Sequence, residues 1–85
     1  MAAGDSTIDS DHRKVHGAMV LTGTFEADNS ARNLTLGKYV LSFSYVNEDD
    51  VQAAKVDINS SAGVVAITLA DAGVDTLRWR AEVIQ

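Results

Sequence analysis

The clearest structural signal in the chain is the run Tyr39-Val40-Leu41-Ser42-Phe43-Ser44-Tyr45. Its large side chains recur at every second position, which places four of them on one face of a strand: Tyr39, Leu41, Phe43 and Tyr45. A helix repeats every 3.6 residues and fits this alternation poorly. We therefore predict a β-strand over residues 39–45.

The same alternation returns near the end of the sequence, over residues 77–83. It predicts four inward residues, Leu77, Trp79, Ala81 and Val83, between three outward ones, Arg78, Arg80 and Glu82. Basic residues beside an aromatic ring can bind nucleic acid or an anionic sugar. On a strand, however, Trp79 points away from both arginines, so we assign it to the core. Arg78 and Arg80 are then candidates for contact with acidic groups of a neighbouring subunit.

Further strand candidates surround these two segments, at residues 18–25, 33–36, 51–58 and 64–69. The candidate at 51–58 is the most polar, and its first residues could also form a helical turn. Gly23 is expected to mark a bulge. Turn-forming Asn, Asp, Ser and Gly separate the runs, and no gap has room for a crossover helix. The prediction is an all-β fold: a small antiparallel β-sandwich or partly open barrel of about six strands.

Residues 1–14 differ from the rest, because they are polar and carry a single large apolar side chain, Ile8, after Met1. They bury too little apolar surface to offset their ordering entropy, so we expect a segment that is mobile in the free chain. We predict an extended N-terminal arm over 1–14 and a β-domain over 15–85. Five candidates for partner contact lie in or beside the arm: Ile8, His12, Arg13, Lys14 and His16.

Composition excludes several classes of function. The chain has 85 residues, no cysteine, no proline and a net charge of −5. Without cysteine there is no disulfide scaffold, thiolate zinc site or thiol nucleophile. An acidic chain is poorly suited to nucleic acid. No stretch is apolar enough for a membrane span, and the start lacks the features of a secretory signal. We therefore expect a product made or assembled in the cytoplasm.

Three segments carry no charge at all, at residues 17–25, 39–47 and 58–70. Natural sheets protect open edges with charge or proline, and this chain has no proline. Either the arm covers these edges or they pack against another subunit, and we favour association. The alternative is that only the charged strands around Lys55 and Arg78 lie at edges.

No motif for catalysis or for tight metal binding is present. His12 and His16 are four residues apart but lack the glutamate of a zinc-protease helix, and Asp9-Ser10-Asp11 lacks the glycine of a calcium loop. The loop at 47–50 (Asn47-Glu48-Asp49-Asp50) could hold a cation weakly or be a solvated turn. We expect no enzyme activity, no cofactor and no metal site. Whether the loop at 47–50 binds a cation stays an open question.

One family resemblance covers roughly residues 17–85. Gly23-Thr24-Phe25 precedes a polar turn, and strands at 34–41 and 63–69 are followed by Asp71-Ala72-Gly73 and an aromatic closing strand. This pattern resembles the small β-structured virion proteins of tailed bacteriophages, especially capsid decoration (cement) proteins. The resemblance implies a homotrimer or other oligomer on the outer capsid surface that binds the major capsid protein and bridges its subunits. It implies no contact with nucleic acid or membrane.

The alternative function is a small carbohydrate- or receptor-binding module, such as a phage fibre or adhesin domain. Such a module needs exposed aromatic side chains, for which the candidates are Tyr39, Tyr45 and Trp79. Exposure of Trp79 is the observation that would favour this alternative.

Overall fold

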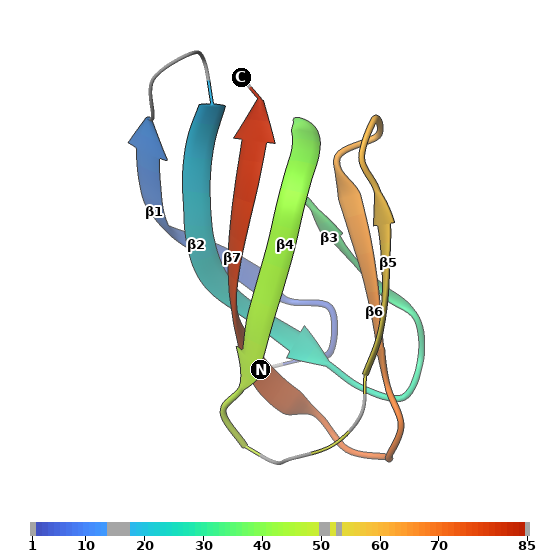
Figure 1. The fold of residues 1–85 in the computed structure, drawn as a ribbon. Helices are drawn as coiled ribbons and strands as arrows, with labels where there is room; N and C mark the ends of the chain where they lie inside the picture. Colours follow the sequence, from blue (N-terminus) through green and yellow to red (C-terminus); the bar gives the residue numbers. More distant parts are fainter. Residues whose placement is uncertain (1, 14–17, 50–51, 53, 85) are drawn as a thin grey trace.

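Seven β-strands make up the computed structural model, which describes residues 2–13, 18–49, 52 and 54–84 (Figure 1). The strands are β1 (Ser6–Arg13), β2 (Ala18–Ala27), β3 (Arg32–Thr35), β4 (Tyr39–Asn47), β5 (Ala54–Asn59), β6 (Val64–Leu69) and β7 (Asp75–Ile84). No helix long and apolar enough to cross a membrane occurs in these residues.

The strands form two antiparallel sheets, which confirms the predicted all-β sandwich. Sheet A has the order β1-β2-β7-β4, and sheet B has the order β3-β6-β5 (Figure 1). Backbone hydrogen bonds link the sheets at two corners, from Leu69 N–H to the Asp28 carbonyl (2.7 Å) and from Val40 N–H to the Ser60 carbonyl (3.1 Å). These links join the two sheets of the sandwich at its corners.

The core lies between the sheets and is built as the alternation in β7 predicted. Four alternate residues of β7 are buried: Leu77, Trp79, Ala81 and Val83. They pack with Phe25 of β2 and with Val65 and Ile67 of β6. Trp79 is only 1% exposed, its indole N–H donates to the Thr24 carbonyl at 3.1 Å, and its ring stacks on Phe43. The predicted core role of Trp79 is therefore confirmed.

A bulge in β4 overturns part of the first alternation. Val40 pairs with Val83 and Ser42 pairs with Glu82, so Leu41 is an extra residue opposite β7. The extra residue shifts the strand by one position. Val40 is consequently 1% exposed and Leu41 51% exposed. The expectation that Tyr39 and Leu41 share a face with Phe43 and Tyr45 is therefore wrong.

A second irregularity lies beside Gly23, in β1 rather than in β2. The register of β1 against β2 shifts between Ile8 and Ser10, whereas β2 pairs with β7 without interruption through Gly23. A Cβ atom added to Gly23 would lie 1.8 Å from the Thr7 carbonyl oxygen. The close approach of β1 thus requires glycine at position 23. The bulge expected at Gly23 lies instead in the neighbouring strand β1, between Ile8 and Ser10.

Residues 6–13, expected within the extended arm, form strand β1 along the edge of β2. The preceding turn is also attached to β2. The Gly4 N–H donates to the Glu26 carbonyl (2.7 Å), and the Glu26 N–H donates to the Asp5 carbonyl (2.8 Å). An uncharged edge was expected to be covered either by the N-terminal arm or by another subunit. For β2, the structure shows coverage by the chain's own N-terminal segment.

Candidate interaction surface

The candidate site is the face of sheet A that points away from sheet B, here called the outer face. Strand register places its residues in rows across β2, β7 and β4. One row is Thr22, Arg80 and Ser44, and the next is Thr24, Arg78 and Val46. The alternation of β7 that buries Trp79 is also what turns both arginines to this face. The predicted outward direction of Arg78 and Arg80 is confirmed.

A shallow hollow of about 470 Å³ lies on the outer face around these rows. Its lining combines hydroxyl, aliphatic and guanidinium groups above two core aromatics: Thr22, Ser44, Val46, Arg78, Arg80, Tyr45 and Trp79. Hydroxyls and guanidinium groups together suit a carboxylate or another oxygen-rich group. The arrangement is suited to binding such a group.

Both arginines have an acidic neighbour within sheet A or next to it. The Nε atom of Arg78 lies 3.4 Å from Glu48, and an Nη atom of Arg80 lies 3.8 Å from Glu82. The arginine side chains are 57% and 50% exposed. Long, solvent-exposed ion pairs of this kind contribute little to stability. They can therefore be exchanged for a partner's carboxylates at small cost.

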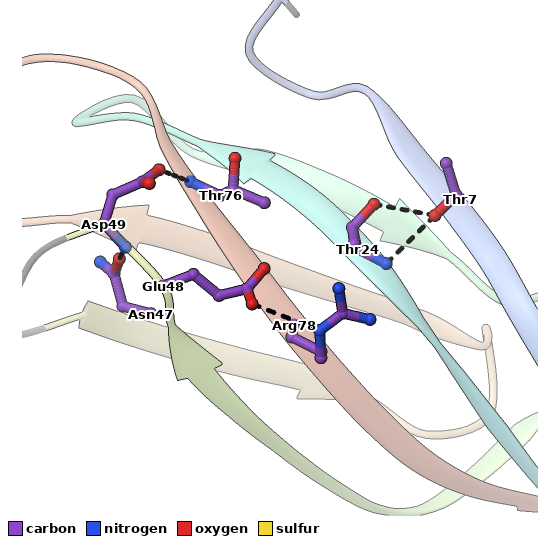
Figure 2. A network of polar contacts seen from close by, with 7 residues as sticks. All are labelled: Thr7, Thr24, Asn47, Glu48, Asp49, Thr76 and Arg78. Atoms are coloured by element: carbon purple, nitrogen blue, oxygen red, sulfur yellow. Dashed lines mark hydrogen bonds and ion pairs between the residues drawn. The ribbon is translucent and has the colours of Figure 1, made fainter.

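The loop after β4 is attached to β7 through its own polar groups (Figure 2). The Asn47 side-chain oxygen accepts from the Asp49 N–H at 2.9 Å, and an Asp49 carboxylate oxygen accepts from the Thr76 N–H at 2.6 Å. Glu48 reaches Arg78, as given above. In the described part of this loop the side-chain oxygens thus hold the turn in place; Asp50 lies outside the described residues.

One buried carboxylate on the outer face was missed by the sequence reasoning. Glu26 is 5% exposed; one of its carboxylate oxygens accepts from the Thr76 hydroxyl at 2.9 Å, and the other has no hydrogen-bond partner among the described residues. The contact with Thr76 joins β2 to β7, which are paired at this position. No local pattern in the sequence signals that contact.

The structure brings together only some of the residues assigned to partner contact. Arg78 and Arg80 share the outer face, and Ile8 is an exposed residue of β1. His12 and Arg13 are opposite Val20 and Met19 in the register of β1 and β2, but their side chains are not described. Lys14 and His16 lie outside the described residues.

The aromatic residues give little support to a sugar-binding site. Trp79 is buried, so the exposure that would favour a carbohydrate-binding module is not found. Tyr45 is partly buried against the core. Tyr39 is exposed, but its partner across the strands is the aliphatic Ile84.

Comparison with known proteins adds no relative. The chain matches no protein-family model, no curated protein and no solved structure.

Proposed function

We propose that this chain is a structural protein of a tailed-bacteriophage virion, of the capsid decoration type. In this role it lies on the outer surface of the shell, binds the major capsid protein and associates with further copies of itself. The mechanism is mechanical, because many weak contacts on a repeating lattice add up to stable attachment.

The observation that carries the proposal is the open outer face of sheet A with its two arginines. In an acidic chain, these two cations lie two residues apart on one strand and line the same hollow. Guanidinium groups recognise carboxylates in a planar, directional way. We therefore assign to this face the contact with acidic side chains of the capsid protein.

The charge of the chain agrees with a position outside the shell. A net charge of −5 is repelled by packaged DNA, whereas it does not oppose attachment to the exterior. The same charge favours solubility before attachment.

The test is binding to empty, expanded capsid shells prepared from the phage that encodes the chain. Purified chain is mixed with shells, the shells are sedimented, and the bound chain is quantified against the major capsid protein. We expect saturable binding at a fixed ratio, and binding of the Arg80→Glu variant that is roughly tenfold weaker.

The matched control is Lys55→Glu, which makes the same charge change on an exposed residue of sheet B. The control should bind as the unmodified chain does. Absence of the chain from purified virions, or binding without saturation, would contradict the proposal. Equal losses in both variants would show that net charge, and not the outer face, controls attachment.

A further inference from the structure

The sheet edges differ in how they are protected. Among the described strands, the edges are β1 and β4 in sheet A and β3 and β5 in sheet B. The sequences of β1, β3 and β5 all contain charged residues, for example Arg32 in β3 and Lys55 and Asp57 in β5. Strand β4 contains none over its nine residues. A long uncharged edge is the kind that pairs with another strand.

The open part of the β4 edge can be located from its hydrogen bonds. The Glu48 N–H donates to the Thr76 carbonyl, so the backbone of Glu48 faces the β7 side. Because backbone groups alternate in direction along an antiparallel strand, those of Ser44 and Val46 face β7 as well. The backbone groups of Phe43 and Tyr45 therefore point to the open side. The start of β4 is closed, since Val40 N–H is bonded to Ser60.

We propose that β4 pairs with β4 of a second copy of this chain, antiparallel and about a twofold axis at Ser44. In this register Phe43 exchanges both backbone hydrogen bonds with the partner's Tyr45, and Tyr45 does the same with the partner's Phe43. Sheet A then continues through the axis into the partner's sheet A. The hydrogen-bonding groups that β4 presents on its open side satisfy one another without any change in the strand.

Charge selects a second copy as the occupant of this edge. The chain is acidic, so two copies repel over most of their surface. At β4 no charge opposes the approach. Lys38 stands before the strand and Glu48 after it, and an antiparallel pair brings these opposite charges of the two copies toward each other. The same pairing covers part of Val46, which is 67% exposed in the single chain.

The predicted pair is weak, because a short edge-to-edge contact is smaller than a standard protein interface. It is therefore concentration-dependent in solution and is strengthened when each copy is also held on a lattice. This inference rests on the self-association within the proposed function. It assigns a twofold pair where the family resemblance implied a homotrimer or another oligomer.

The experiment measures the mass of the free chain by sedimentation equilibrium over a wide concentration range. We expect a reversible monomer–dimer equilibrium. Ser44→Glu places two carboxylates opposite each other at the axis and should weaken the pair about fivefold. Within one chain the new carboxylate lies beside Arg80, so the fold is retained. The matched control is Thr35→Glu, which adds the same charge to the exposed edge strand β3 and should leave the dimer unchanged.

Two further measurements separate this register from other contacts. A mixture of Ser44→Glu and Ser44→Arg chains should form a heterodimer tighter than either homodimer. Amide hydrogen exchange of Phe43 and Tyr45 should slow as the concentration rises, whereas the amides of Ser44 and Val46, already bonded to β7, should not change. A monomer at all concentrations, a trimer, or a dimer indifferent to Ser44→Glu would overturn the pairing. None of these results concerns shell binding, which the sedimentation test decides separately.

Discussion

At the scale of single residues, Gly23 is the position where the fold tolerates least. An added Cβ would lie 1.8 Å from the Thr7 carbonyl oxygen and 3.0 Å from the Trp79 ring. One contact is to backbone and the other to a buried ring, so neither can give way easily. We expect Gly23→Ala to lower the free energy of unfolding by about 2 kcal/mol, mainly by displacing β1.

Chemical denaturation measures the effect of Gly23→Ala, with Ser42→Ala on the exposed side of β4 as the control. The amides of β1 should lose protection from hydrogen exchange before those of β7. Unchanged stability would contradict the close packing of β1 on Gly23.

Asp28 supplies the residue-scale prediction about pH. Both carboxylate oxygens accept from the Arg32 guanidinium at 3.0 Å, and this bond, with help from the Ser30 N–H, holds the pKa of Asp28 below its ordinary value of 3.8. Because the folded pKa is the lower one, the stabilisation is present above pH 3.8 and is lost as the pH falls through the folded pKa.

The measurement is the free energy of unfolding of the wild type and of Asp28→Asn from neutral pH to below pH 3.8. We expect the variant to be less stable at neutral pH and the difference to shrink in acid. Asp57→Asn, which removes an exposed carboxylate of β5, is the control. A difference that stays constant into acid would show that the carboxylate–guanidinium pair is not its source.

At the scale of the strand, the bulge in β4 predicts that Val40 matters more for stability than Leu41. Simple alternation of inward and outward residues would predict the opposite. Val40 is buried against Val83 and Leu41 is exposed. We expect Val40→Ala to cost about 2 kcal/mol, from lost burial and the cavity left behind. Leu41→Ala should change the free energy of unfolding by less than about 0.5 kcal/mol. Denaturant titrations of the two variants decide the matter, and a larger cost for Leu41→Ala would contradict the bulge.

Strands were predictable from sequence where side chains alone determine their faces. The alternation in 77–83 and the β-branched run in 64–69 correspond to β7 and β6, and the inward direction of Trp79 followed from the same pattern. The bulge at Leu41 was not predictable, because an inserted residue is defined only by the partner strand. Strand β1 was not predicted because its polar sequence shows no apolar alternation, whereas the structure places it by its pairing with β2.

The candidate surface, too, could be predicted from the sequence only in part. Arg78 and Arg80 could be placed on one face because period-two alternation leaves them no other position. Their neighbours in the hollow, Thr22 and Ser44, come from strands that are remote in sequence and became neighbours only through register. The hydrogen bond between Glu26 and Thr76 joins residues 50 positions apart, and such a long-range contact cannot be read from local sequence patterns.

At the scale of the whole molecule, the negative net charge predicts that added salt has opposite effects on the two proposed contacts, the β4–β4 dimer and the attachment to shells. Two chains of charge −5 repel, and salt screens that repulsion. Lys38 and Glu48 at the ends of β4 attract over a short range and orient the pair, whereas the repulsion that salt screens acts between the whole chains. We expect the dimer to become severalfold tighter between low and physiological salt, whereas attachment to shells through Arg78 and Arg80 becomes weaker.

Sedimentation of the free chain and of chain–shell mixtures over one salt series measures both effects. The Arg80→Glu chain should lose most of the salt dependence of shell attachment, whereas its dimer should still become tighter as salt is added. Salt responses of the same sign in both experiments would contradict the assignment of shell attachment to the two arginines and of the dimer to the uncharged β4 edge.

The position of β7 between β2 and β4 has a consequence for synthesis on the ribosome. Strand β7 is made after every other described strand, yet it supplies the hydrogen bonds to both of its neighbours in sheet A. Until it emerges, β2 and β4 have no strand between them, and the rings of Phe25 and Phe43 lack Leu77 and Trp79 as packing partners. Sheet A can therefore close only after β7 has been made, and until then the nascent chain presents two uncharged strand segments, at residues 18–25 and 39–47, to its surroundings.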